Sequence, residues 1–136
     1  MDLESNSQVR LTSEDAAQPI ESALQDRPGN GWKAALPGAQ TIWINFVVPQ
    51  DIREIHLRFE ATEQRTQEFV LHSSSDAGRS YREIVRQQFN FSPDSTPTEV
   101  ENYFLHLIGV TDLKLTITPD ISGGNARATL RALRIR

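Results

Sequence analysis

The sequence predicts an all-β fold, an antiparallel β-sandwich or jelly roll that allows one short helical turn. Apolar and polar residues alternate in one segment after another beyond residue 40, and turn-forming residues separate these segments. No long stretch keeps the 3.6-residue period of an amphipathic helix. Short strands divided by turns in this way are typical of sandwiches and jelly rolls.

The strand signals are runs in which every second residue is apolar, as expected for strands that are buried on one face. These runs occupy 42–46, 55–60, 68–72, 103–107 and 113–118. The rhythm slips by one residue at Ile84 and Val85, and again after Leu130. A β-bulge produces such a slip, so we expect a bulge in each of the two segments.

Turn residues indicate where the strands end. Residues 49–51 separate the first two long strands, 75–78 form a hairpin turn, and 108–110 form a short link. The loop 92–97 holds two prolines, which central strands do not accept. Residues 119–125 form a further loop.

The first 40 residues carry weaker signals. Residues 9–11 and 19–21 are expected to form short strands, and Ser13 is expected to cap a helical turn over 13–17. The polar residues 1–7 are expected to be disordered. The whole chain, 1–136, is predicted to be a single domain, because 136 residues suit one core.

Composition excludes several function classes. A net charge of −4 gives no general attraction to nucleic acid or to an anionic membrane, so neither partner is expected. The absence of cysteine excludes a thiol nucleophile and a Cys-ligated zinc site. The start of the chain is no signal peptide, and no apolar run is long enough to span a membrane. The expectation is a cytoplasmic protein, provided that Met1 is the natural start.

No motif of an enzyme is present, so we expect a non-catalytic protein. The histidines, at 56, 72 and 106, lack the spacing of a metal-binding pair. The serines at 73–75 lack a Gly-x-Ser-x-Gly elbow, and Gly123-Gly124 does not continue into a phosphate-binding loop. An enzyme such as a glycoside hydrolase would need two carboxylates that face each other across a cleft.

From about residue 20 onward, the order of features resembles the galactose-binding-like (discoidin) superfamily. An Asp-containing loop, 23–26, precedes Gly31-Trp32, and the strand Trp-Ile-Asn-Phe-Val-Val begins at Trp43. The turn 75–78 leads to Tyr81, and a Leu-x-x-Leu segment closes the chain. The chain departs from the family at Val47, where the family often has Asp. The resemblance implies a jelly roll that binds sugars, lipid headgroups or proteins through loops at one end.

The resemblance also implies a structural calcium ion, which relatives hold with the Asp-containing loop and a Glu of the last strand. Asp26 and Asn30 are the candidate ligands here, together with loop carbonyls. Ala132 stands where the family has that Glu. We therefore expect no bound cofactor, and expect Asp26 to hold the loop by hydrogen bonds.

Strand direction places the loops 25–32, 61–67 and 120–127 at the same end of the sandwich. A sugar site needs a planar aromatic ring and polar groups for the hydroxyls. The candidate ligand-binding residues are Trp32, Arg65, Asp120, Asn125 and Arg127. This leading hypothesis, carbohydrate binding, requires Trp32 to be partly exposed, whereas the family more often buries the corresponding tryptophan. The alternative is a protein-interaction or structural domain with no small-molecule ligand, and the oligomeric state stays open.

Overall fold

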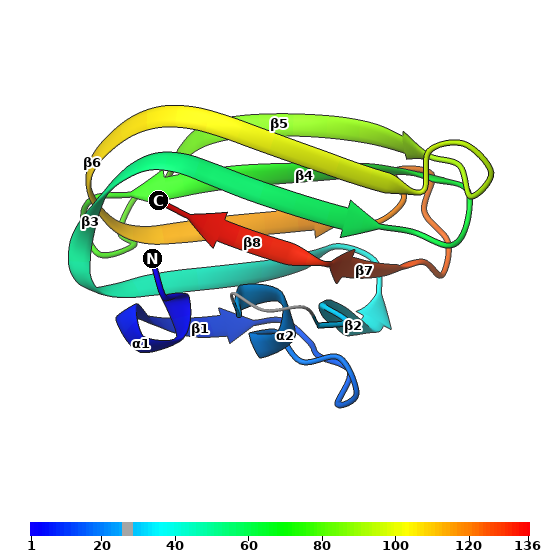
Figure 1. Ribbon diagram of the computed structural model, residues 1–136, viewed down its shortest axis with the longest axis horizontal. Helices are drawn as coiled ribbons and strands as arrows, with labels where there is room; N and C mark the ends of the chain where they lie inside the picture. The colour runs from blue at the N-terminus through cyan, green and yellow to red at the C-terminus, as the bar shows by residue number, and fades with distance from the viewer. Residues whose placement is uncertain (26–28) are drawn as a thin grey trace.

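The computed structural model describes residues 1–25 and 29–136, and it shows an antiparallel β-sandwich with short helical segments at one side (Figure 1). The predicted fold class is therefore confirmed. The helices are α1 (Leu3–Asn6) and α2 (Glu21–Leu24). The strands are β1 (Ser7–Leu11), β2 (Trp32–Pro37), β3 (Gln40–Glu60), β4 (Arg65–Ser74), β5 (Arg82–Phe91), β6 (Thr98–Thr118), β7 (Arg127–Leu130) and β8 (Ala132–Ile135).

Two long strands, β3 and β6, pair with each other and run through both layers of the sandwich. The first half of β3 pairs with β1, and the second half of β6 pairs with β4, which in turn pairs with β5. The second half of β3 pairs with β8 instead. Both strands bend sharply at the same end of the molecule (Figure 1).

The expected breaks at 49–51 and 108–110 were wrong, because both segments are bends inside continuous strands. The β3–β6 register shifts repeatedly between Asn45 and Glu54, so the extra residues are absorbed as bulges. Proline is tolerated at such a bulge, where no ladder hydrogen bond is lost. On the opposite strand Gly109 takes a positive φ of 67°, and its N–H donates to Asp51 Oδ1 over 3.0 Å.

Of the two expected bulges, the first is confirmed. Leu71 lies opposite Val85 and His72 lies opposite Glu83, which leaves Ile84 as the extra residue. The second slip has another cause: after Leu130 the chain changes partner, since β7 pairs with β2 and β8 pairs with β3.

The N-terminal segment differs from the prediction except for its first strand, which β1 confirms. Residues 13–17 form no helix, and α2 begins at Glu21, where a strand was expected. Residues 1–7, expected to be disordered, include α1. Leu3 of this helix is only 1% exposed, and the terminal ammonium donates to Ile135 O over 3.1 Å. Leu3 thus packs the start of the chain against the core.

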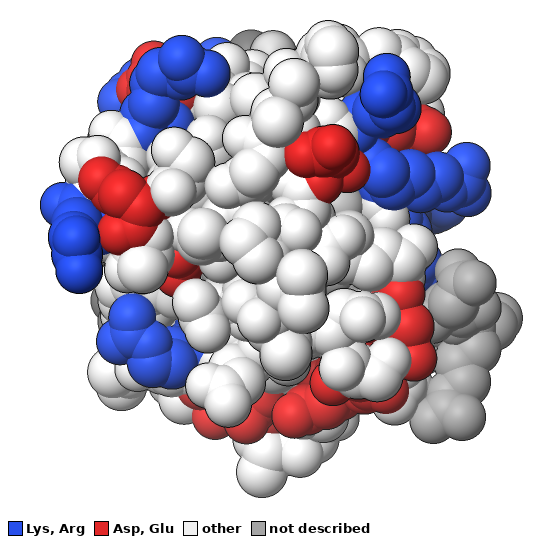
Figure 2. All heavy atoms as spheres, turned by 90° about the vertical axis from the view of Figure 1, so that its left-hand side faces the viewer, with Lys and Arg blue, Asp and Glu red and all other residues white. Residues whose placement is uncertain are grey.

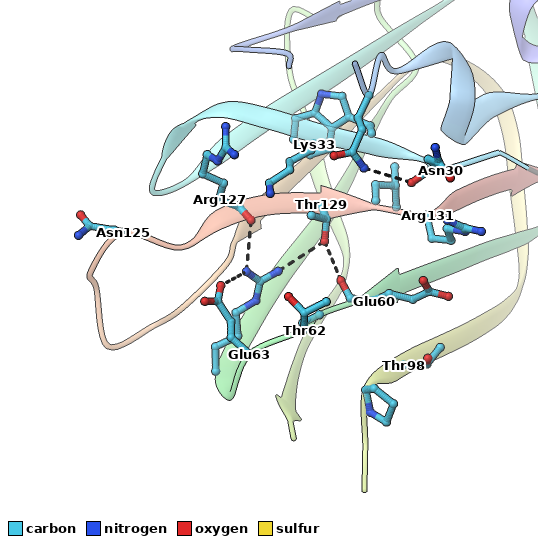
Figure 3. Close-up of a pocket in the computed structure, with 16 residues that line it drawn as sticks. Asn30, Lys33, Glu60, Thr62, Glu63, Thr98, Asn125, Arg127, Thr129 and Arg131 are labelled. Carbon is cyan, nitrogen blue, oxygen red and sulfur yellow. Dashed lines mark hydrogen bonds and ion pairs between the residues drawn. The ribbon is translucent and has the colours of Figure 1, made fainter. Parts of the chain in front are cut away.

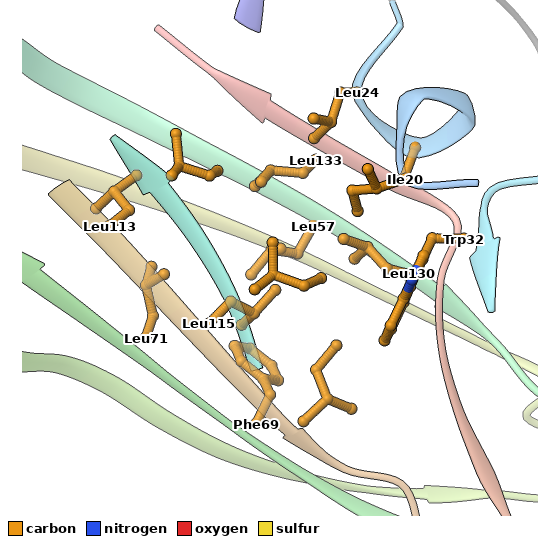
Figure 4. Packing of buried hydrophobic residues seen from close by; sticks show 14 of the residues in the cluster. Ile20, Leu24, Trp32, Leu57, Phe69, Leu71, Leu113, Leu115, Leu130 and Leu133 are labelled. Atoms are coloured by element: carbon orange, nitrogen blue, oxygen red, sulfur yellow. The ribbon is translucent and has the colours of Figure 1, made fainter. Parts of the chain in front are cut away.

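The core lies between the two layers and extends beneath the helices (Figure 4). Leu57 and Leu133 from one layer face Phe69 and Leu115 from the other. Each such buried side chain contributes about 1.5–3 kcal/mol relative to an exposed one. Ile20 and Leu24 close the core on the helical side. In the described part of the chain, no helix has the length and apolar character needed to cross a membrane.

Candidate functional site

A polar cleft opens at the end of the sandwich opposite the bends of β3 and β6 (Figure 3). Its volume is about 600 Å³, which suits a small ligand. Its lining comes from β2, the β3–β4 loop, the start of β6, and the segment that runs through β7. The lining residues include Gln18, Asn30, Lys33, Thr62, Glu63, Thr98, Asn125, Arg127, Thr129 and Arg131.

The β3–β4 loop is fastened to β7 by Arg65, the first residue of β4. Arg65 Nη1 donates to Glu63 Oε1 over 3.0 Å and to the backbone oxygen of Arg127 over 3.2 Å. Its Nη2 donates to Thr129 Oγ1 over 3.4 Å. Arg65 is only 7% exposed, so its main role is to hold two walls of the cleft together.

The β7 wall of the cleft is polar because buried apolar residues and polar residues alternate along this strand. Ala128 and Leu130 are completely buried. Successive side chains of a strand point to opposite faces, so Arg127 and Thr129 lie on the other face, where they line the cleft together with Arg131, the residue after β7. Lys33 of β2 pairs in register with Thr129 and therefore lies beside it (Figure 3).

Most charges around the cleft already have partners. Glu63 pairs with Arg65, and Glu60 pairs with Arg58 over 3.3 Å. Arg127 Nη1 lies 3.6 Å from Asp15 Oδ2. Within the part of the chain that the structure describes, the side chains of Lys33 and Arg131 make no ion pair or hydrogen bond.

Four of the five predicted ligand-binding residues meet at this cleft: Trp32, Arg65, Asn125 and Arg127. Asp120 does not line it. Its Oδ1 accepts from the N–H of Ser122 over 3.0 Å, so it holds the turn of its own loop. Asn125 lies at the outer end of the cleft in Figure 3.

Trp32 lines the cleft from beneath and presents no ring face to it. It is 1% exposed, and its Nε1 donates to the backbone oxygen of Ser13 over 3.2 Å. The exposure that the carbohydrate hypothesis required of this residue is therefore absent. Among the described residues that line the cleft, Trp32 is also the only aromatic one. A sugar held there would be recognised by polar groups and not by stacking.

Of the two candidate calcium ligands, Asp26 lies outside the described residues. Asn30 is exposed, and its backbone oxygen accepts from Gln18 Nε2 over 3.4 Å. Among residues 1–25 and 29–136, no three His, Asp or Glu side chains gather as a metal site would require. The expectation that no calcium ion is bound stays a prediction.

Sequence reasoning missed Lys33, Thr62, Thr98, Thr129 and Arg131. A local signal existed for part of this set, since Arg127, Thr129 and Arg131 alternate with apolar residues. Lys33 had no such signal, because only the pairing of β2 with β7 brings it next to Thr129.

The enzyme alternative needs two carboxylates across the cleft. Glu60 and Glu63 both line it, but they come from one segment, and their carboxylates lie on opposite sides of Thr62 in Figure 3. Both are also held by arginines. The facing geometry of a glycosidase pair is therefore not formed by these two residues.

No family profile and no curated protein sequence matches the chain. Several solved structures are similar to the chain in fold. The family 32 carbohydrate-binding module of NanJ from Clostridium perfringens, solved with galactose, superimposes with a TM-score of 0.74 at 13% identity, covering 98% of this chain and 96% of that one. CpGH89CBM32-5 from Clostridium perfringens, solved with GalNAc-β-1,3-galactose, gives 0.69 at 19% identity, with coverage of 98% and 97%. A pectin-binding carbohydrate-binding module gives 0.67 at 18% identity, with coverage of 96% and 90%. These likenesses show a galactose-binding-like sandwich fold.

Proposed function

We propose that this chain, which has the galactose-binding-like sandwich fold, is a non-catalytic carbohydrate-binding module whose ligand occupies the cleft beside β7. The single observation that carries the proposal is the cleft itself. It has a volume of about 600 Å³, and neutral and charged polar groups line it from several separate segments. The same fold carries sugars in the structurally similar modules that were solved as complexes.

Recognition would depend on hydrogen bonds to sugar hydroxyls. Thr62, Thr98 and Asn125 offer neutral donors and acceptors, and Lys33 and Arg131 offer charged donors. Because no ring face is available, the stacking contribution usual for an apolar sugar face is lost. We therefore expect weak binding of single sugars and tighter binding of ligands that reach several of these groups.

The test is to map amide chemical shifts while a panel of monosaccharides and disaccharides, galactose included, is titrated into the protein. We expect shifts at 61–64, at Thr98 and at 125–131. Asn125→Ala should weaken these shifts, whereas Gln8→Ala, a change at an exposed residue of β1, should leave them unchanged. If no sugar shifts any amide that lines the cleft, the proposal is wrong.

A second candidate function is protein binding at the opposite end, where the bends of β3 and β6 lie. Val47, Val48 and Ile108 are 69%, 62% and 66% exposed there. Figure 2 shows that the centre of this face carries no Lys, Arg, Asp or Glu. Exposed apolar surface of this kind can mark a contact with another protein. Sedimentation velocity of the wild type and of Val48→Asp tests whether the face mediates self-association, and no difference between them would remove that form of the idea.

A further inference from the structure

The charge of the cleft is opposite in sign to that of the whole protein. The chain has a net charge of −4. By contrast, the described residues that line the cleft include four basic and two acidic side chains: Lys33, Arg65, Arg127, Arg131, Glu60 and Glu63. A basic surface on an acidic domain is not explained by overall composition, so its cause must be local.

The basic residues of the cleft come from the segments next to Thr129 of β7. Arg65 Nη2 donates to Thr129 Oγ1 over 3.4 Å, and Lys33 is the register partner of Thr129 on β2. Arg127 lies two residues before Thr129 on the same face of β7, and Arg131, the residue after β7, also lines the cleft. Like charges repel one another, and an anion that lies among them offsets this repulsion.

The protein supplies only part of that anion. Glu63 neutralises Arg65, and Asp15 lies at the longer distance of 3.6 Å from Arg127. Lys33 and Arg131 have no acidic partner among the described residues. Lys33 and Arg131 are half-buried, and half-buried cations interact more strongly with an anion than fully exposed cations do.

We propose that the ligand of this cleft is an acidic glycan, whose carboxylate or sulfate group lies between Lys33 and Arg131 next to Thr129. The inference rests on the proposed carbohydrate-binding function and adds the substrate class. Arginine presents a planar fork that fits a carboxylate or sulfate with two hydrogen bonds, and lysine adds a point charge. The Thr129 hydroxyl and the amide of Asn125 would then contact neighbouring sugar hydroxyls.

The experiment compares three ligands by calorimetry and amide shift mapping: an oligogalacturonate, the same oligomer fully methyl-esterified, and galactose 6-sulfate. The methyl ester removes the negative charge of the carboxylate and keeps the sugar. Galactose 6-sulfate tests whether the anionic group is a sulfate and not a carboxylate. The test variant is Lys33→Gln/Arg131→Gln. The control is Arg53→Gln/Arg79→Gln, which removes the same charge at exposed residues that do not line the cleft.

We expect at least one acidic ligand to bind more tightly than the neutral ester, with an affinity that falls at high ionic strength. The test variant should bind the acidic ligand about tenfold or more weakly, as expected for a lost charge-assisted contact of about 1.5–3 kcal/mol. The control variant should lose less than about twofold in affinity. If neutral sugars shift the cleft amides and the test variant leaves all affinities unchanged, the acidic-glycan inference is wrong while carbohydrate binding stands. If neither acidic nor neutral sugars shift these amides in folded protein, the proposed function itself is wrong. Equal loss in test and control variants would show non-specific attraction and would also overturn the inference.

Discussion

A buried carboxyl group should make this protein less stable as the pH rises. Glu99 on β6 is only 1% exposed, and its Oε1 accepts a hydrogen bond from the completely buried Gln67 Nε2 over 3.2 Å. Burial raises the pKa of Glu99 from 4.5 to about 9, and the neighbouring Glu101 carboxylate adds to the rise. The folded protein therefore keeps this proton at neutral pH, whereas the unfolded chain loses it near pH 4.5.

The sign follows from the count of bound protons. Between these two pKa values the folded state binds one more proton than the unfolded state, so the free energy of unfolding falls as the pH rises. One proton corresponds to about 1.4 kcal/mol per pH unit, or about 4 kcal/mol between about pH 5 and about pH 8. That is a large share of the total stability of a typical domain, which is about 5–15 kcal/mol.

The perturbation is Glu99→Gln, which keeps the shape of the protonated side chain and removes its titration. Urea unfolding at a series of pH values should give a free energy that falls with pH in the wild type and stays nearly level in the variant. Glu21→Gln, at an exposed carboxylate of α2, should keep the wild-type slope. Parallel slopes for the wild type and Glu99→Gln would refute the reasoning, because the proton would then not be held in the folded state.

Three further predictions concern the cleft and the far hairpin. Gly31→Ala should destabilise the fold by about 1–3 kcal/mol in urea unfolding, because of backbone strain at a positive φ. Gly31 has φ of 76°, and a Cβ atom there would lie 2.6 Å from Leu130 O. Arg65→Met should cost about 1–3 kcal/mol in the same assay, because it removes the hydrogen bonds that join the β3–β4 loop to β7. Arg65→Lys should lose a similar amount, because lysine lacks the planar fork, and wild-type stability in Arg65→Lys would contradict a role for that fork. Hydrogen bonds from the hydroxyls of Ser74 and Ser80 lower the pKa of Asp76 from 3.8 to about 2. The stabilising contribution of this carboxylate should be present above about pH 4 and disappear as the pH falls through about 2, and an amide-shift titration of the hairpin should lose that transition in Asp76→Asn.

The parts of the fold that the sequence predicted are those set by local pattern. Alternation identified the strands, and strand direction identified the end where the binding loops meet. The two bends in β3 and β6 were not predictable in this way. Whether Pro49 ends a strand or lies in a bulge depends on the strand opposite, and that strand, around Gly109, is about 60 residues away in sequence.

The residues of the candidate site likewise fall into those that a local pattern locates and those that it does not. Arg65, Asn125 and Arg127 reach the cleft because they lie at or next to strand ends, which a pattern can locate. Asp120 fails because its short side chain bonds to the backbone of its own turn, as Asp often does. Trp32 is buried because β2 pairs with β7 through Leu130, which places the ring against the core.

The position of the basic groups in the cleft is tied to the packing of the core. Ala128 and Leu130 are completely buried, so β7 cannot rotate without losing core contacts, and Thr129 and the residues beside it keep their direction towards the cleft. A site held by a packed strand pays less conformational entropy on binding than a site on loops. Asn125 lies on such a loop and can change without disturbing β7. If the cleft binds an acidic glycan as proposed, the β2–β7 pair would set the preference for charge, and the loops would set which sugar is accepted.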